Sequence, residues 1–204
     1  MPIAFRRRTD PPLTLVASVP DRGLPTLEAQ RLRLRWLTTD DLPDLARLIL
    51  DHGDSRSWNR GAASDHGDAT IFLESVQRGV EIGQQFQWGI ALREEDRVIG
   101  TVSLYGIDHL QGRADIGFAL IRDQWGKRYA REAVAVLLDH AFGALQLRRI
   151  EADVDPRSSA ALSTLDHLGF RREGYLRQRW RIGSELQDSV LMGLLASDWH
   201  GRKG

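Results

Sequence analysis

The chain has 204 residues, enough for one domain of ordinary size with a substantial core. Its 28 basic and 28 acidic residues cancel, which argues against a broad nucleic-acid-binding surface and favours a local basic patch for a small anion. It has no cysteine, which excludes disulfides, thiol catalysis and cysteine-based zinc sites.

The first residues look like an extension of the domain. Residues 1–26 contain five of the seven prolines and the run Arg6-Arg7-Arg8, which we interpret as a charged tail rather than a nucleic-acid-binding arm. The start lacks the uninterrupted apolar core of a signal peptide, and no apolar run approaches a membrane span. We therefore expect a cytoplasmic protein without membrane contact, with a single domain over residues 27–204.

The first part of that domain reads as a strand and two helices. Leu32, Leu34 and Trp36 alternate with arginines as in a half-buried strand. Thr38 and Asp41 resemble a capping box at the start of a helix. The polar stretch 51–68 contains Asp-His-Gly-Asp twice, but the spacing matches no metal motif, so we expect a loop and no metal site. A second helix is predicted over 69–84, with Asp68 as its cap.

Strands dominate the rest of the chain. Short links between 86–93, 98–105 and 115–121 predict an antiparallel meander. A helix over 126–143 then leads to a strand at 150–154, and this crossover predicts that the strands before and after it are parallel neighbours. A short helix capped by Ser158 ends at Gly169, and the segments 175–182 and 188–195 form a final hairpin.

The junction before the long helix is suited to an anion. Gln124-Trp125-Gly126-Lys127-Arg128 links a strand to a helix start, where backbone N–H groups lack intrahelical partners. Two cations beside a helix N-terminus oppose the helix dipole, and a bound anion would explain them. The alternative is that Lys127 and Arg128 are simply the solvated first turn of the helix.

Several short motifs in order carry a family resemblance. They are Ile116-Gly117-Phe118, Trp125-Gly126-Lys127-Arg128-Tyr129-Ala130, Arg149-Ile150-Glu151-Ala152, Leu168-Gly169-Phe170, Glu173-Gly174 and Gln187-Asp188-Ser189-Val190. Together they resemble the GNAT N-acetyltransferases, in particular the branch of the ribosomal-protein N-terminal acetyltransferases, over residues 27–199.

The resemblance implies a fold and a co-substrate. The fold would be α/β (α+β), with a mixed, mostly antiparallel sheet of about seven strands flanked by about four helices and splayed at the fourth strand. Acetyl-CoA would lie in the opening, and no metal is expected. Its pantetheine arm would meet the backbone of Phe118, Ala119, Leu120 and Ile121. Its pyrophosphate would meet amides of Trp125, Gly126, Lys127, Arg128, Tyr129 and Ala130, and Ser158 completes the cofactor-binding set.

Two positions depart from the family pattern. Arg128 stands where the family usually has a second glycine, and we expect altered binding rather than certain loss, because a helical Arg128 would still offer its N–H. Leu165 stands where the family often has a tyrosine that acts as general acid, so another group or a water must assist the proton transfers.

The remaining site residues are candidates with open alternatives. Glu151 and Asp188 are the candidate catalytic carboxylates, and for each a solvated strand face is an equal alternative. Tyr175 and Trp180 are candidate substrate-binding residues, because the resemblance places the last hairpin beside the acceptor site.

These observations predict an acetyl-CoA-dependent N-acetyltransferase. The acceptor would be a primary amine, either a peptide or protein N-terminus or a small-molecule amine, and transfer would be direct because no cysteine can carry an acyl group. The alternative from another class is a non-catalytic acyl-CoA-binding or regulatory module. A homodimer is a further expectation from the family branch.

Overall fold

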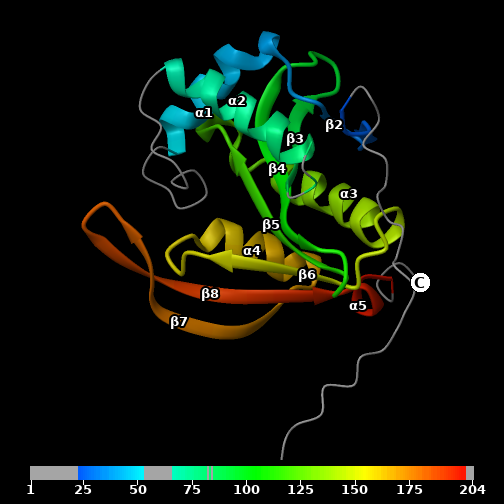
Figure 1. The fold of residues 1–204 in the computed structure, drawn as a ribbon, viewed down its shortest axis with the longest axis vertical. Coiled ribbons are helices and arrows are strands. Elements are labelled where there is room, and N and C mark those ends of the chain that lie inside the picture. The colour runs from blue at the N-terminus through cyan, green and yellow to red at the C-terminus, as the bar shows by residue number, and fades with distance from the viewer. Residues whose placement is uncertain (1–22, 53–65, 82, 84, 201–204) are drawn as a thin grey trace, which may run out of the picture.

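A computed structural model describes residues 23–52, 66–81, 83 and 85–200. One sheet of eight strands is flanked by helices on both faces (Figure 1). The strands are β1 (Leu27–Glu28), β2 (Leu32–Arg35), β3 (Gln85–Leu92), β4 (Val98–Asp108), β5 (Arg113–Leu120), β6 (Arg149–Val154), β7 (Arg171–Ile182) and β8 (Glu185–Leu195). The helices are α1 (Leu42–His52), α2 (His66–Glu81), α3 (Tyr129–Gly143), α4 (Ser159–Leu168) and α5 (Ala196–His200).

The sheet has the predicted mixed topology. Its order is β1-β2-β3-β4-β5-β6-β8-β7, and every neighbouring pair is antiparallel except β5 and β6, which are parallel on either side of α3. The eighth strand is β1, whose two residues are too short to show an alternating pattern in the sequence. The parallel crossover and the mostly antiparallel sheet are thus confirmed, with one more strand and one more helix than expected.

Several predicted boundaries are wrong. The helix predicted from Gly126 begins at Tyr129, while its end at Gly143 is confirmed. The helix α2 starts at His66, so Asp68 lies inside it and is not its cap. The predicted loop 51–68 is shorter, because α1 extends to His52, and its middle lies outside the described residues, as do residues 1–22 of the predicted extension.

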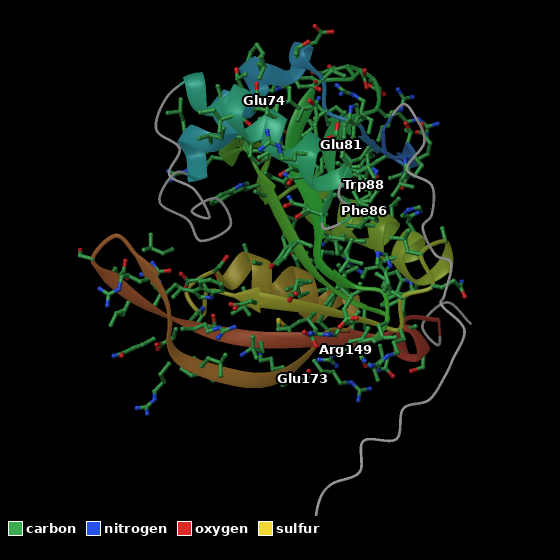
Figure 2. The ribbon with its side chains drawn as sticks, in the orientation of Figure 1. Glu74, Glu81, Phe86, Trp88, Arg149 and Glu173 are labelled. Atoms are coloured by element: carbon green, nitrogen blue, oxygen red, sulfur yellow. The ribbon has the colours of Figure 1, made fainter. Side chains whose placement is uncertain are left out.

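Apolar side chains fill both faces of the sheet. The larger cluster joins α3 and α4 to the central strands, and Phe86 and Trp88 meet edge to face within it at 6.4 Å between ring centroids (Figure 2). The smaller cluster packs α1 and α2 against β3 and β4 through Leu37, Leu45 and Leu73. The larger cluster also contains Leu48 of α1 and Val80 of α2, so the helices on both faces bury apolar side chains against the sheet.

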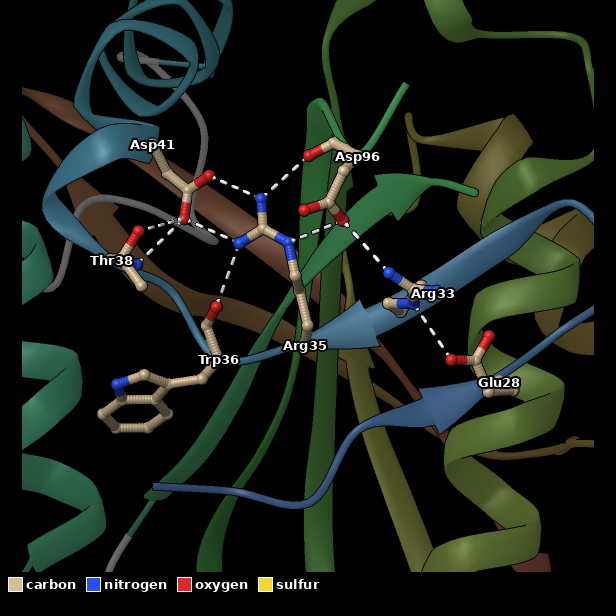
Figure 3. Close-up of polar contacts among 7 residues, drawn as sticks. All are labelled: Glu28, Arg33, Arg35, Trp36, Thr38, Asp41 and Asp96. Atoms are coloured by element: carbon tan, nitrogen blue, oxygen red, sulfur yellow. Dashed lines mark hydrogen bonds and ion pairs between the residues drawn. The ribbon is translucent and has the colours of Figure 1, made fainter. Parts of the chain in front are cut away.

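A guanidinium holds the start of α1 against the sheet. Arg35 donates to both carboxylate oxygens of Asp41, at 2.9 and 2.8 Å, and its Nε donates to Asp96 in the β3–β4 turn (Figure 3). The predicted capping box of Thr38 and Asp41 is present. Burial alone would raise the pKa of Asp41, but the hydrogen bonds from Arg35 and Thr38 outweigh it and hold that pKa below its usual value.

None of the helices in the described part of the chain is both long and apolar enough to cross a bilayer.

Candidate functional site: the opening between β5 and β6

The two parallel strands are paired at one end only. Arg113–Asp115 pairs with Arg149–Glu151, but β5 continues to Leu120 and β6 to Val154 without further pairing between them. The sheet thus opens toward the carboxyl ends of both strands (Figure 1). When the two-residue β1 is left out of the count, β5 is the fourth strand, and the predicted splay is confirmed.

The edge of β5 presents backbone groups to this opening. Ile121 donates its N–H to the Ile99 carbonyl at 2.9 Å, so the odd-numbered residues of β5 direct their backbone groups toward β4. By alternation, the N–H and C=O of Phe118 point away from β4, toward β6. Of the four residues predicted for the pantetheine arm, Phe118 and Leu120 therefore face the opening, whereas the Ile121 N–H is used within the sheet. The Leu120 carbonyl accepts from the Trp125 indole at 2.7 Å.

The turn after β5 contains two residues with left-handed backbones. Gly126 has φ +76°, and Arg128, which precedes the first residue of α3, has φ +64° and ψ +16°. The prediction that Arg128 has a helical backbone is therefore wrong. A left-handed residue followed by the right-handed Tyr129 makes successive N–H groups converge, an arrangement that binds anions in proteins.

Cationic side chains surround this turn. Lys127 and Arg128 are exposed, and the Lys127 ammonium donates to the Gln124 amide oxygen at 2.9 Å. The Arg128 side chain has no hydrogen-bond or ion-pair partner among residues 23–52, 66–81 and 85–199. With the N–H groups at the start of α3, these charges make the turn a candidate anion site.

Ser158 lies on the other side of the opening, just past the end of β6. It precedes α4, and its carbonyl accepts the Leu162 N–H at 3.1 Å, but its hydroxyl caps no N–H of that helix. The predicted start of the helix is confirmed, whereas the side-chain cap is not formed. Leu165, inside α4, is fully buried.

Glu151 sits where the opening begins. It is the last β6 residue paired with β5, and its carboxylate accepts from Arg113 at 3.2 Å and from Arg149 at 2.7 Å. Arg149 also binds Glu173, which lies beside it (Figure 2), and this contact holds the pKa of Glu173 below its ordinary value. Glu151 is thus part of an ion network and is still partly exposed at 29% of its side chain.

Asp188 lies on the opposite face of the sheet. Its carboxylate accepts the Tyr175 hydroxyl at 2.6 Å and the Gln178 N–H at 2.7 Å, and these two bonds hold the pKa of Asp188 below its ordinary value. Along β8 it shares a face with Val190, which is buried in the α3 and α4 cluster, whereas Glu151 pairs with Gly193 on the other face. The structure therefore does not bring the two candidate carboxylates together.

The two candidate substrate-binding residues are separated in the same way. Tyr175 is exposed beside Asp188, while Trp180 donates its indole N–H to Asp153 at 3.0 Å on the Glu151 face. Ser189, which is fully buried, also donates to Asp153. Residues five positions apart on a strand lie on opposite faces, and the bulge between Leu176 and Trp180 keeps this relation because it adds two residues to β7.

An open cleft of about 680 Å³ lies at the end of β5 that pairs with β6. Tyr105, Asp115 and Glu151 are directly paired across β4, β5 and β6, so they share the face that α2 covers. Arg113 lines the cleft and donates to Glu151. The other lining residues come from the end of α2, from β3 and from the β4–β5 turn: Gly79, Gln85, Tyr105, Gly106, Ile107, Asp108 and His109.

This geometry agrees with the comparison to known families. The acetyltransferase (GNAT) domain matches residues 31–171, more than half of the chain. An N-acetyltransferase of Bacillus licheniformis called p20 is 34% identical over 176 residues, which cover 86% of this chain and 99% of p20. The chain belongs to the GNAT acetyltransferase family. It is accordingly an acetyl-CoA-dependent N-acetyltransferase.

Other GNAT proteins are similar over most of their length. RimJ of Mycobacterium smegmatis, solved in complex with CoA-disulfide, has a TM-score of 0.76 at 25% identity over 85% of this chain and 88% of that one. The ribosomal-protein-S5-alanine acetyltransferase of Vibrio fischeri has a TM-score of 0.73 at 23% identity, over 86% of this chain and 98% of that one. The spermidine N(1)-acetyltransferase of Escherichia coli is 24% identical over 80% of this chain and 86% of its own length.

Sequence reasoning missed residues from distant parts of the chain that contact the turn at residues 125–130 and the last hairpin. Arg31, in the β1–β2 turn, forms an ion pair with Glu132 of α3 at 2.8 Å. The two residues are 101 positions apart, and no local pattern could link them. Asp153 was missed for the same reason, because its partners Trp180 and Ser189 come from the last hairpin.

Proposed function

We propose that this acetyltransferase transfers its acetyl group to the α-amine of a peptide or protein N-terminus, by direct attack within a ternary complex. The observation that carries the proposal is the mixed-charge cleft at the closed end of the sheet opening, whose lining residue Arg113 donates to Glu151.

The residues around the opening fit coenzyme A. A diphosphate requires several convergent N–H donors and cations, and the turn from Trp125 to Ala130 supplies both. The pantetheine arm carries amide groups that can bond to the outward N–H and C=O of Phe118. Ser158 borders the same opening with a hydroxyl that is not used for capping. These residues would bind acetyl-CoA, which supplies the activated acetyl group.

The position of Glu151 favours it as the proton acceptor. The anion site follows the carboxyl end of β5, so an arm that runs back along β5 ends near the point where β5 and β6 pair. In direct transfer the amine nitrogen attacks the thioester carbon, the C–S bond breaks, the sulfur leaves with a proton, and the amine loses one. Glu151 would accept the amine's proton, directly or through a water, while the neighbouring groups orient the acceptor.

The charge of the cleft favours a peptide over a polyamine. A polyamine carries several positive charges and requires several carboxylates, but the described lining residues include one carboxylate, Asp108, beside Arg113 and His109. A peptide N-terminus carries one amine followed by neutral amides, which suit Gln85 and Tyr105. The S5-alanine acetyltransferase is named for a protein acceptor, and the spermidine acetyltransferase for the second candidate, a polyamine.

The test is thiol release on a panel of acceptors. Because the chain contains no cysteine, a thiol reagent reports only the coenzyme A that is released. We expect a higher kcat/KM for peptides with a free N-terminus than for spermidine, and no release with the same peptides after N-terminal blocking. A preference for spermidine would favour a polyamine as the acceptor. Coenzyme A binding without release on any acceptor would favour a non-catalytic module.

A further inference from the structure

The backbone N–H and the side chain of Arg31 both bind residues in the first turn of α3. The Arg31 N–H donates to Glu132 Oε1 at 2.6 Å, and its Nε donates to Glu132 Oε2 at 2.8 Å. Its guanidinium also lies over the Tyr129 ring, 4.5 Å from the centroid, and Nη1 donates to the Lys127 carbonyl at 3.2 Å. One side chain from the other end of the domain thus contacts both the candidate anion site and the helix behind it.

The contact with Lys127 sets the orientation of one peptide. In a trans peptide the C=O and the following N–H point in opposite directions. Because Arg31 holds the Lys127 carbonyl on its own side, the Arg128 N–H points the other way, away from Arg31. That N–H is the first of the convergent series created by the left-handed backbone of Arg128 and the start of α3.

The contact with Glu132 controls local charge. The Glu132 carboxylate lies in the first turn of α3, and its side chain is only 17% exposed. An unpaired carboxylate there would repel a bound diphosphate. Arg31 occupies both of its oxygens and thereby neutralises it.

Arg31 is itself held in place. Its carbonyl accepts the Arg93 N–H at 3.0 Å, and the Arg93 side chain donates to the Ala29 carbonyl at 3.2 Å. Both contacts come from the residues that follow β3, so the turn that carries Arg31 is fixed to the sheet. A fixed donor can hold a peptide in an orientation that the turn alone would not keep.

We infer that Arg31 is a positioning residue for the diphosphate of acetyl-CoA: it fixes the Lys127–Arg128 peptide so that its N–H faces the anion, and it neutralises Glu132. This inference rests on the proposed use of the turn at residues 125–130 as the diphosphate site.

The test compares two acyl donors, one with the diphosphate and one without it. For Arg31→Ala we expect kcat/KM with acetyl-CoA to fall about tenfold or more, the scale of losing a hydrogen bond to a charged group, through a higher KM. With S-acetylpantetheine, which lacks the diphosphate, kcat/KM should stay within about twofold of wild type. Arg33→Ala, which removes an exposed pair with Glu28 on the next strand, is the matched control and should leave both unchanged.

Calorimetric measurement of coenzyme A binding distinguishes a failure of the role of Arg31 from a failure of the diphosphate site. Arg31→Lys keeps the charge and safeguards against misfolding, and it should bind more weakly than wild type because an ammonium cannot form the forked contacts. Arg31→Ala/Glu132→Gln removes the repulsion and should still bind about tenfold more weakly. Wild-type affinity in that double variant would overturn the role of Arg31 in fixing the Lys127–Arg128 peptide, and equal losses with both acyl donors would overturn the inference as a whole. A wild-type protein that does not bind coenzyme A would overturn the diphosphate site itself.

Discussion

At the scale of single residues, Arg128 has a left-handed backbone at the turn that begins α3. A glycine would adopt φ +64° without cost, whereas a left-handed backbone costs an L-residue roughly 1–2 kcal/mol. Strain of this kind persists where the surroundings enforce it, and it clusters at binding sites. Here the Arg31 contact with Lys127 and the start of α3 enforce it.

Replacement of Arg128 by glycine should therefore stabilise the free protein. We expect Arg128→Gly to raise the free energy of unfolding by about 0.5–1 kcal/mol, measured by urea denaturation, because the strain is released. The matched control is Arg131→Gly, an exposed position inside α3, which should lose about 1 kcal/mol. Destabilisation by Arg128→Gly would contradict the strain argument.

Glu151, the proposed proton acceptor, can be tested by a single substitution. Glu151→Gln should lower kcat by about 100-fold and leave the KM for acetyl-CoA within about twofold, because the amide is nearly isosteric but cannot accept the proton. Asp188→Asn is the comparison, and its kcat should change little because Asp188 lies on the opposite face and already binds Tyr175 and Gln178. The reverse ranking would assign the role to Asp188.

At the scale of elements, a side chain of β8 stabilises the bulge in β7. Between Leu176 and Trp180 the strand has extra residues opposite Asp188, and Gln178 adopts φ +52°. The Asp188 carboxylate accepts the Gln178 N–H, so a side chain replaces the missing ladder partner.

Removal of the Asp188 carboxylate should loosen the β7 bulge and change the pKa of Tyr175. In Asp188→Ala we expect faster hydrogen exchange at the Gln178 amide, since it loses its partner. The pKa of Tyr175, which Asp188 raises, should fall toward its ordinary value, as followed by NMR of the ring. Glu185→Ala on the same strand removes an exposed pair with Arg157 and a hydrogen bond from the Gln187 amide, and it should change neither quantity. Unchanged exchange at Gln178 would show that the bulge does not need the carboxylate.

At the scale of the whole molecule, Arg35 ties together β2, the start of α1 and the β3–β4 turn (Figure 3). The Asp41 side chain is only 6% exposed, so loss of its partner would leave a buried charge. Such losses cost about 3 kcal/mol or more, whereas exposed pairs contribute about 1 kcal/mol or less. This network therefore matters for the stability of the fold more than the exposed ion pairs do.

The contribution of the Arg35–Asp41 pair to stability should fall as the pH is lowered. The folded pKa of Asp41 lies below the unfolded value, so the pair stabilises the fold above about pH 4 and this contribution is lost as the pH falls through the folded pKa. Arg35→Met should destabilise by about 3 kcal/mol at pH 7, and the difference from wild type should shrink below about pH 4. Denaturation series at several pH values measure this. Arg33→Met, whose partners are exposed, should show a small and nearly pH-independent loss.

Much of the fold could be predicted from local patterns. The capping box at Thr38, the strand that becomes β6 and the left-handed stop at Gly169 depend on residues close in sequence, and all three are found. The parallel pairing followed from the length of the crossover through α3. Boundaries failed where tertiary contacts override propensity, as at the start of α3, where the expected helical turn of 126–128 is replaced by two left-handed residues.

The sequence by itself determined the family and the acetyl donor, and it predicted the region of the candidate anion site, because short motifs and strand-to-helix spacing are local properties of the chain. Only the tertiary structure decided how the candidates are arranged. It separated Glu151 from Asp188 by a sheet face, and it brought Arg31 to a helix about a hundred residues later. Sheet register, a bulge and long-range ion pairs depend on the packing of distant segments, and no local pattern encodes them.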